Sequence, residues 1–212
     1  MFPNITKIEY LLRPLPGFWI AAPIIRSLAL AQWKWFRLDP PPLGVKAALI
    51  LRKAKAAGVT TFVETGTFFG DMIHAVAPHF GKIISIELDQ RLWQRARTRF
   101  ADRPHITLLQ GDSGTVLGEV QPTLDAPCLF WLDGHYSGSA TARGESDTPI
   151  VAELNHIFAS SQLPHVILID DARLFGTAAD YPTFEYVRNL TAERRPGWTV
   201  TLEDDVICIE PR

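Results

Sequence analysis

The stretch that decides the fold reads Phe62-Val63-Glu64-Thr65-Gly66-Thr67-Phe68-Phe69-Gly70. An apolar, β-branched run ends in a carboxylate, and two glycines then lead directly into a helix-like segment. This order is typical of a strand that enters a tight turn before a helix. Glycine there lets the backbone approach a ligand closely, and the helix offers unpaired N–H groups. The stretch therefore predicts a binding site for a nucleotide-type cofactor.

A second apolar run, Lys82-Ile83-Ile84-Ser85-Ile86-Glu87, also ends in a carboxylate. Glu87 lies 87 − 64 = 23 residues beyond Glu64. This is close to the spacing of about 20 residues at which a ribose-binding acid follows a glycine loop. Two acids at two strand ends point to one site.

Strand-like and helix-like segments alternate along most of the chain. We expect strands at 60–64, 83–87, 106–109, 128–132 and 166–170, helices at 45–57, 71–79, 89–101, 113–120, 149–159 and 181–193, and a closing hairpin of strands 198–202 and 206–209. Repeated β–α order produces a parallel sheet with helices on both faces. The sequence thus predicts a Rossmann-like α/β fold with a seven-stranded sheet, mostly parallel, that ends in an antiparallel hairpin.

The amino-terminal segment predicts a helical extension, residues 1–43, before a main domain at 44–212. Residues 15–35 are strongly apolar, but Pro16, Gly17, Pro23 and Arg26 interrupt any run long enough to span a membrane. The stiff sequence Asp39-Pro40-Pro41-Pro42 then separates the two parts. The extension either packs on the main domain or a partner subunit, including a second copy, or it lies on a membrane surface or covers the active site.

The amino-acid composition limits the fold classes and partners that are expected for this protein. The 212 residues are 47% hydrophobic, which suits one α/β domain with an extension. Lys and Arg number 21 against 23 Asp and Glu, so the net charge of −2 provides no global attraction to nucleic acid, and we expect no nucleic-acid partner. Cys128 and Cys208 lie in apolar runs, which favours reduced, buried thiols and a cytoplasmic location.

Acidic residues end successive predicted strands or follow them closely. They are Glu64, Glu87, Asp112, Asp133 and Asp170. The carboxyl ends of parallel strands border one crevice, so these side chains should converge on a single pocket. Any one of them alone is better explained as a helix cap or turn former, but five at successive strand ends are not.

This set resembles the class I S-adenosylmethionine-dependent methyltransferases over residues 58–210. The pattern Glu64-x-Gly66-x-x-x-Gly70 is similar to the first motif of that family, with Phe68 replacing the middle glycine as in the catechol-type O-methyltransferases. The resemblance implies S-adenosylmethionine as cofactor, with Glu87 on the ribose hydroxyls and Asp112 at the adenine amino group. The cofactor-binding residues that it implies are Glu64, Thr65, Gly66, Thr67, Gly70, Glu87, Leu88, Asp112, Ser113 and Asp133.

The glycine spacing also bears on the alternatives. A dinucleotide-binding site typically has the pattern Gly-x-Gly-x-x-Gly. Here Phe68 occupies the position of the second glycine, two residues after Gly66. This counts against a nucleotide-dependent oxidoreductase, which stays open as one alternative. A non-catalytic cofactor-binding or partner protein on the same fold is another.

The fourth predicted strand ends in Asp133-Gly134-His135-Tyr136. In the family that this chain resembles, this strand end lies beside the transferable methyl group. Imidazole titrates near neutral pH, so His135 is a candidate base for a substrate hydroxyl, with Asp133 as its catalytic neighbour. The alternative is that His135 only orients Asp133 or fixes the turn.

Adjacent carboxylates, Asp170 and Asp171, lie at the end of the fifth predicted strand. The resemblance to catechol-type and macrolide-sugar O-methyltransferases implies that Asp133, Asp170 and Asp171 hold Mg²⁺ or another divalent cation, with Asp171 in place of the asparagine of the catechol-type enzymes. Three converging carboxylates would otherwise repel one another. A metal-free site, in which one of the pair caps the following loop, is the alternative. The activity implied is O-methylation of a small-molecule, sugar or natural-product hydroxyl.

Overall fold

The computed structural model describes residues 3–15, 17–134, 148–160, 163–178 and 180–212. The chain forms two compact units, Met1–Leu49 and Ile50–Arg212. Helix α3 (Leu43–Ala57) crosses from the first unit into the second. The boundary after residue 43 stays a prediction.

The first unit contains the helices α1 (Ile5–Leu12) and α2 (Phe18–Phe36), which pack against each other. A buried carboxylate links them, because Oε1 of Glu9 on α1 accepts hydrogen bonds from Arg13 at 3.1 Å and from Arg26 of α2 at 2.9 Å. Helix α2 continues through Pro23. Even so, among the described residues no helix combines the length and the apolar character needed to cross a membrane.

The second unit is built on one seven-stranded sheet. Its strands are β1 (Thr61–Thr65), β2 (Lys82–Glu87), β3 (Ile106–Gln110), β4 (Cys128–Leu132), β5 (Val166–Ile169), β6 (Thr199–Glu203) and β7 (Val206–Glu210). The order across the sheet is β3-β2-β1-β4-β5-β7-β6. Strands β1 to β5 are parallel, while β7 pairs antiparallel with both β5 and β6. The predicted Rossmann-like fold with its closing hairpin is confirmed.

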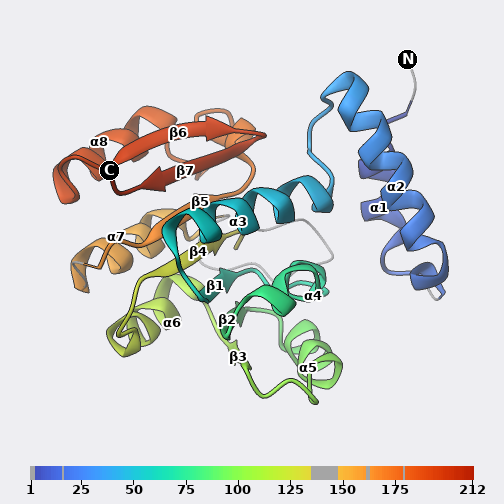
Figure 1. Ribbon diagram of the computed structural model, residues 1–212, viewed down its shortest axis with the longest axis horizontal. Coiled ribbons are helices and arrows are strands. Elements are labelled where there is room, and N and C mark those ends of the chain that lie inside the picture. Colours follow the sequence, from blue (N-terminus) through green and yellow to red (C-terminus); the bar gives the residue numbers. More distant parts are fainter. Residues whose placement is uncertain (1–2, 16, 135–147, 161–162, 179) are drawn as a thin grey trace. The chain divides into compact units, whose positions relative to one another are not determined.

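Helices cover both faces of this sheet (Figure 1). They are α4 (Asp71–Val76), α5 (Gln90–Arg99), α6 (Ser113–Val120), α7 (Ile150–Ser160) and α8 (Phe184–Arg194), with 3₁₀ turns at Ala77–His79, Gln121–Thr123 and Ala172–Leu174. Helices α4 and α5 lie on one side of the strands, and α6 and α7 lie on the other (Figure 1). The boundaries differ from those predicted by a few residues at most, because strand and helix ends depend on local hydrogen bonds.

Alternation along β1 distributes its side chains between the two faces. Val63 packs into the large core cluster that α6, α7 and α8 cover. Phe62 points to the opposite face, where its ring lies 5.2 Å from that of Phe80. The same alternation sends Glu64 and Thr65 to opposite faces, so the two residues that end this strand have different neighbours.

The two cysteines are buried free thiols, as predicted. Burial raises the pKa of Cys128 and of Cys208 to about 12. Neither thiol is therefore a thiolate at neutral pH, and both act as small apolar side chains in the sheet.

Candidate active site

The loop after β1 holds the carboxylate at the end of β2. Oε2 of Glu87 accepts a hydrogen bond from the backbone N–H of Phe68 at 2.7 Å, and Oε1 accepts one from the N–H of Asp89 at 2.9 Å. The N–H of Gly66 also bonds the carbonyl of Ile86 at 2.9 Å. Burial raises the pKa of Glu87, while the backbone N–H groups of Asp89 and Phe68 act in the opposite direction. The loop thus fixes the position of this carboxylate.

Gly66 is required by the packing of the chain itself. Its φ is +80°, and a Cβ built there would lie 2.4 Å from the carbonyl oxygen of Asp133. Glycine at this position therefore lets the β1 loop pass close to the backbone at the end of β4, and its role in cofactor binding stays a prediction. Phe68, the residue in place of the middle glycine, has a φ of +50°. Such strain costs about 1–3 kcal/mol and is common at functional sites.

The end of β3 lies beside Glu87, because the N–H of Gly111 bonds the carbonyl of Glu87 at 3.0 Å. Asp112 follows and is the N-cap residue of α6, but its side chain makes no capping hydrogen bond. By contrast, the side chain of Asp89 caps α5 through the N–H groups of Arg91 and Leu92. The capping explanation thus fits Asp89 and not Asp112. Leu88 lies next to this edge and accepts a hydrogen bond from Gln110 at 3.0 Å.

Glu64 lies beneath the loop. It is buried, and its Oε2 accepts a hydrogen bond from the hydroxyl of Ser85 at 2.6 Å. That hydroxyl lies 2.6 Å from the hydroxyl of Thr67, so Ser85 links the end of β1 to the loop. Burial raises the pKa of Glu64 well above its usual value. The structure thus places the Glu64 side chain in a hydrogen-bonded support for the glycine loop.

Glu153 on α7 is a site residue that the sequence analysis missed. It is fully buried at the ends of β1 and β4, and burial raises its pKa to about 7. The hydroxyls of Ser113 and Thr65 are near enough to lower that pKa, yet Oε1 makes no hydrogen bond of standard geometry within the described residues. Gly134 leaves the space for it, because a Cβ there would lie 3.3 Å from Oε1.

The signal for Glu153 was present in the sequence. It lies three residues after the buried Ile150 and four before the buried Ile157, which is the spacing of the core-facing side of a helix. An acid on that side has to be buried.

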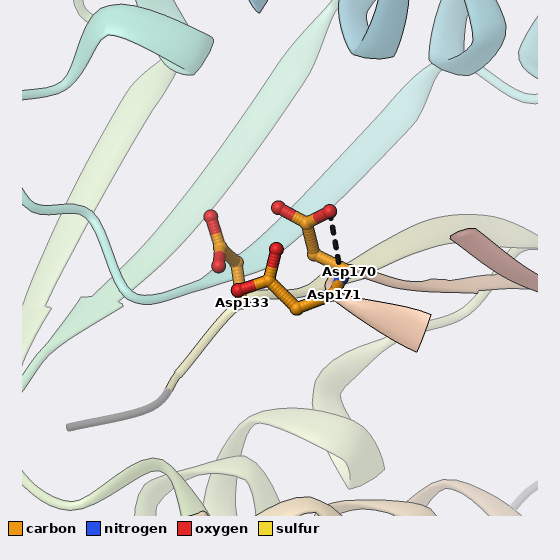
Figure 2. Close-up of side chains that lie close together, drawn as sticks. All are labelled: Asp133, Asp170 and Asp171. Carbon is orange, nitrogen blue, oxygen red and sulfur yellow. Dashed lines mark hydrogen bonds between the residues drawn. The ribbon is translucent and has the colours of Figure 1, made fainter. Parts of the chain in front are cut away.

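Three aspartates converge where β4 and β5 end (Figure 2). One carboxylate oxygen from each of Asp133, Asp170 and Asp171 lies within 4.8 Å of the other two. Asp170 and Asp171 are buried, and the N–H of Asp171 donates to Oδ1 of Asp170 at 2.8 Å. Asp171 has a φ of +56°, which turns its side chain back toward Asp133 (Figure 2). The predicted set of metal ligands is therefore brought together, and its role stays a prediction.

Arg173 supplies positive charge at the edge of this cluster. Its guanidinium lies 2.8 Å from Oδ1 of Asp171 and also pairs with Asp205. One of the three carboxylates is therefore partly neutralised within the chain. Arg173 thus offsets the negative charge that Asp171 brings to the cluster.

The same end of the sheet carries a pocket. Its polar lining residues are Asp133, Thr148, Glu153, Asp170 and Tyr181, and its apolar ones include Leu132, Ile150, Ile169 and Phe175. Burial and the nearby aspartates raise the pKa of Tyr181, so this phenol stays protonated. His135, the predicted base, lies outside the described residues.

No family model matches the sequence, and the comparison with curated proteins gives no match. Solved structures do match the fold. An O-methyltransferase from Bacillus cereus, in complex with S-adenosylhomocysteine (SAH), superposes with a TM-score of 0.59 at 12% identity, over 98% of each chain.

With the strand order 3-2-1-4-5-7-6, this similarity decides the architecture. The chain has the class I S-adenosylmethionine-dependent methyltransferase fold. The O-methyltransferase TomG from Streptomyces achromogenes, in complex with S-adenosylmethionine, matches this methyltransferase fold with a TM-score of 0.57 at 20% identity, over 88% of this chain and 89% of TomG. The N-methyltransferase NodS from Bradyrhizobium japonicum WM9, in complex with SAH, matches it with a TM-score of 0.55 at 16% identity, over 83% and 91%.

Proposed function

We propose that this protein transfers a methyl group from S-adenosylmethionine to a hydroxyl oxygen of a small molecule, sugar or natural product. One observation supports the proposal most. The backbone of the glycine loop holds Glu87, and Glu87 is joined directly to the end of β3, where Asp112 follows. These residues belong to the edge of the sheet at which open α/β folds bind ligands.

Glu87 suits the sugar of the cofactor. Its two carboxylate oxygens have about four acceptor sites, and two backbone N–H groups use one on each oxygen. Acceptor capacity then remains for the two neighbouring hydroxyls of a ribose. The backbone hydrogen bonds also fix the carboxylate before the ligand arrives, so little ordering entropy is lost on binding. Leu88, Asp112 and Ser113 are the proposed neighbours of the adenine.

The acidic cluster suits a hard divalent cation. Magnesium and calcium take oxygen ligands at about 2.0–2.6 Å, so two ligands of one ion are at most about 4–5 Å apart. The oxygens of Asp133, Asp170 and Asp171 are within 4.8 Å of one another. Such an ion, when bound, lowers the pKa of an acceptor hydroxyl and holds its oxygen.

For methyl transfer the protein mainly has to align the acceptor oxygen with the methyl group and to remove the proton of the acceptor hydroxyl. S-adenosylmethionine supplies the activated methyl group. Asp133, which follows β4 directly, is proposed to orient the acceptor, and His135, two residues further, is the proposed base that receives the hydroxyl proton. The apolar wall of Leu132, Ile169 and Phe175 helps to exclude water from the pocket.

Thermal unfolding with two ligands tests the cofactor class. SAH at about a hundred times its dissociation constant should stabilise the fold by about 2.7 kcal/mol, which raises the midpoint by about 5–10 °C. NAD at the same concentration should leave the midpoint unchanged. A shift with NAD alone favours the oxidoreductase. A shift with SAH, without transfer to any of a set of phenol, sugar and macrolide acceptors, favours a cofactor-binding partner protein.

Calorimetry with Mg²⁺ or Mn²⁺ alone tests the metal proposal. The wild type should bind one ion, and Asp170→Asn should weaken binding at least about tenfold because it removes a charged ligand. Asp125→Asn, at an exposed aspartate outside the cluster, is the matched control and should bind as the wild type does. If neither ion binds, or if a chelator leaves turnover intact, the metal proposal fails and the methyltransferase proposal stands.

A further inference from the structure

Helix α2 exposes an apolar stripe, defined as Ile20, Ile24, Leu28 and Trp35. Their exposed fractions are 67%, 67%, 53% and 85%. At about 100° per residue the four side chains fall within an arc of about 80°, so they form one continuous line along the helix. The packing side of α2 is a different one, where Ala22, Ala29 and Trp33 are buried. Four large apolar side chains in one line need a partner, unlike single exposed ones.

Charge indicates what that partner is. The first unit, Met1–Leu49, has six basic and two acidic residues, and therefore a net charge of 6 − 2 = +4. The second unit has 15 basic and 21 acidic residues, a net charge of −6. The apolar stripe thus belongs to a positively charged unit of an otherwise acidic protein, which suits an anionic surface.

Individual cations are available at the surface of this unit. Lys7 and Lys34 are exposed and form no ion pair within the described residues. Lys34 precedes Trp35 and the exposed Phe36 directly. Aromatic side chains next to lysines are typical of helices that lie at a membrane–water interface, because the rings enter the headgroup region while the cations meet lipid phosphates.

We infer that the first unit binds the surface of an anionic phospholipid bilayer, with the apolar stripe of α2 in the interface and α2 parallel to the membrane. In the described part of the chain no helix is fit to span a bilayer, so the mode is surface binding. A second copy suits the stripe less well, because two units that each carry +4 would be brought face to face.

Vesicle flotation with the full-length protein tests this inference. Vesicles of phosphatidylcholine with about 30% phosphatidylglycerol should carry the protein upward, and vesicles of phosphatidylcholine alone should carry much less. Raising the salt from about 0.1 M to about 1 M should weaken binding, since the Debye length falls from about 10 Å to about 3 Å.

Two substitutions separate the apolar and the electrostatic parts. Leu28→Glu should lower the partition coefficient at least about tenfold, because it removes an aliphatic group that enters the membrane interface and adds a charge of the wrong sign. Leu202→Glu is the matched control, since Leu202 is 58% exposed on β6, outside the stripe, and should change little. Lys34→Gln should cost about fivefold, as expected for one cation near an anionic surface.

Several outcomes would overturn the inference. Failure of the wild type to float with either vesicle is one, and a loss as large for Leu202→Glu as for Leu28→Glu is another. Light scattering adds a third: a dimer without lipid that Leu28→Glu dissociates would assign the stripe to a second copy. Circular dichroism must show that Leu28→Glu keeps its helices. SAH binding by the second unit is measured separately, so the outcome is independent of the proposed methyl transfer.

Discussion

The substitution Glu153→Gln should make the free energy of unfolding less dependent on pH. Glu153 is fully buried, and burial raises the pKa of its carboxyl to about 7 from an ordinary value of 4.5. The folded protein therefore binds this proton more tightly than the unfolded chain does. The stabilising contribution is complete below about pH 4.5 and is lost as the pH rises through about 7, because the buried carboxylate then becomes charged.

The shift of about 2.5 pKa units corresponds to about 3 kcal/mol in total, since one unit is worth 1.36 kcal/mol. Between about pH 5 and pH 8 the wild type loses most of this contribution, about 2–3 kcal/mol of its free energy of unfolding. Glutamine has nearly the same shape and never ionises. The difference in unfolding free energy, variant minus wild type, should therefore become more positive by about 2–3 kcal/mol from pH 5 to pH 8.

Urea titrations at the two pH values, with a chelator present, measure this double difference. Other buried acids, such as Glu64 and Glu87, cancel because both proteins contain them. Glu119→Gln, at an exposed position of α6, is the control and should show no change between the two pH values. A change for Glu153→Gln that is no larger than for this control would refute the idea that the carboxyl is buried with a raised pKa.

Three further changes probe the supports of the site. Gly66→Ala should lower the thermal midpoint steeply, because a Cβ would lie 2.4 Å from a backbone oxygen, whereas Gly58→Ala, also at positive φ but in open space, should cost only about 1 kcal/mol; equal losses would contradict the close approach. Ser85→Ala should cost about 1–3 kcal/mol in denaturant titrations, since Glu64 loses its hydroxyl donor; an unchanged midpoint would show that this hydrogen bond does not stabilise the loop. Asp170→Asn should raise the concentration of divalent cation needed for half-maximal turnover at least about tenfold, because it removes one charged ligand; an unchanged concentration would place the ion elsewhere.

Most of the fold follows from the sequence because local pattern and global topology agree. Apolar runs of four to six residues alternate with helical segments, which predicts the parallel sheet. The sequence Glu203-Asp204-Asp205 lies between the last two strands and predicts the closing hairpin. The neighbouring ends of β2 and β3, where the N–H of Gly111 bonds the carbonyl of Glu87, follow in turn, because strand order dictates which ends are neighbours.

Details that depend on tertiary packing cannot be predicted from the sequence in this way. The need for glycine at position 66 comes from a backbone 67 residues away (133 − 66), which no local pattern reports. Glu64 and Glu87 look alike in sequence, yet the pleat directs Glu64 to Ser85 beneath the loop, while the loop holds Glu87 by its backbone. The apolar stripe of α2 could not be predicted from the sequence either, because both sides of that helix are apolar. Only the packing against α1 shows which side is buried.

Calorimetric titration of SAH into the wild type, Glu87→Ala and Glu119→Ala tests the central claim most directly. A carboxylate that accepts two ribose hydroxyls contributes about 3 kcal/mol or more, so Glu87→Ala should weaken binding at least about a hundredfold. Glu119→Ala, on the exposed side of α6, should bind SAH as the wild type does. Equal affinity in all three proteins, with the Glu87 variant shown to be folded, would contradict the account.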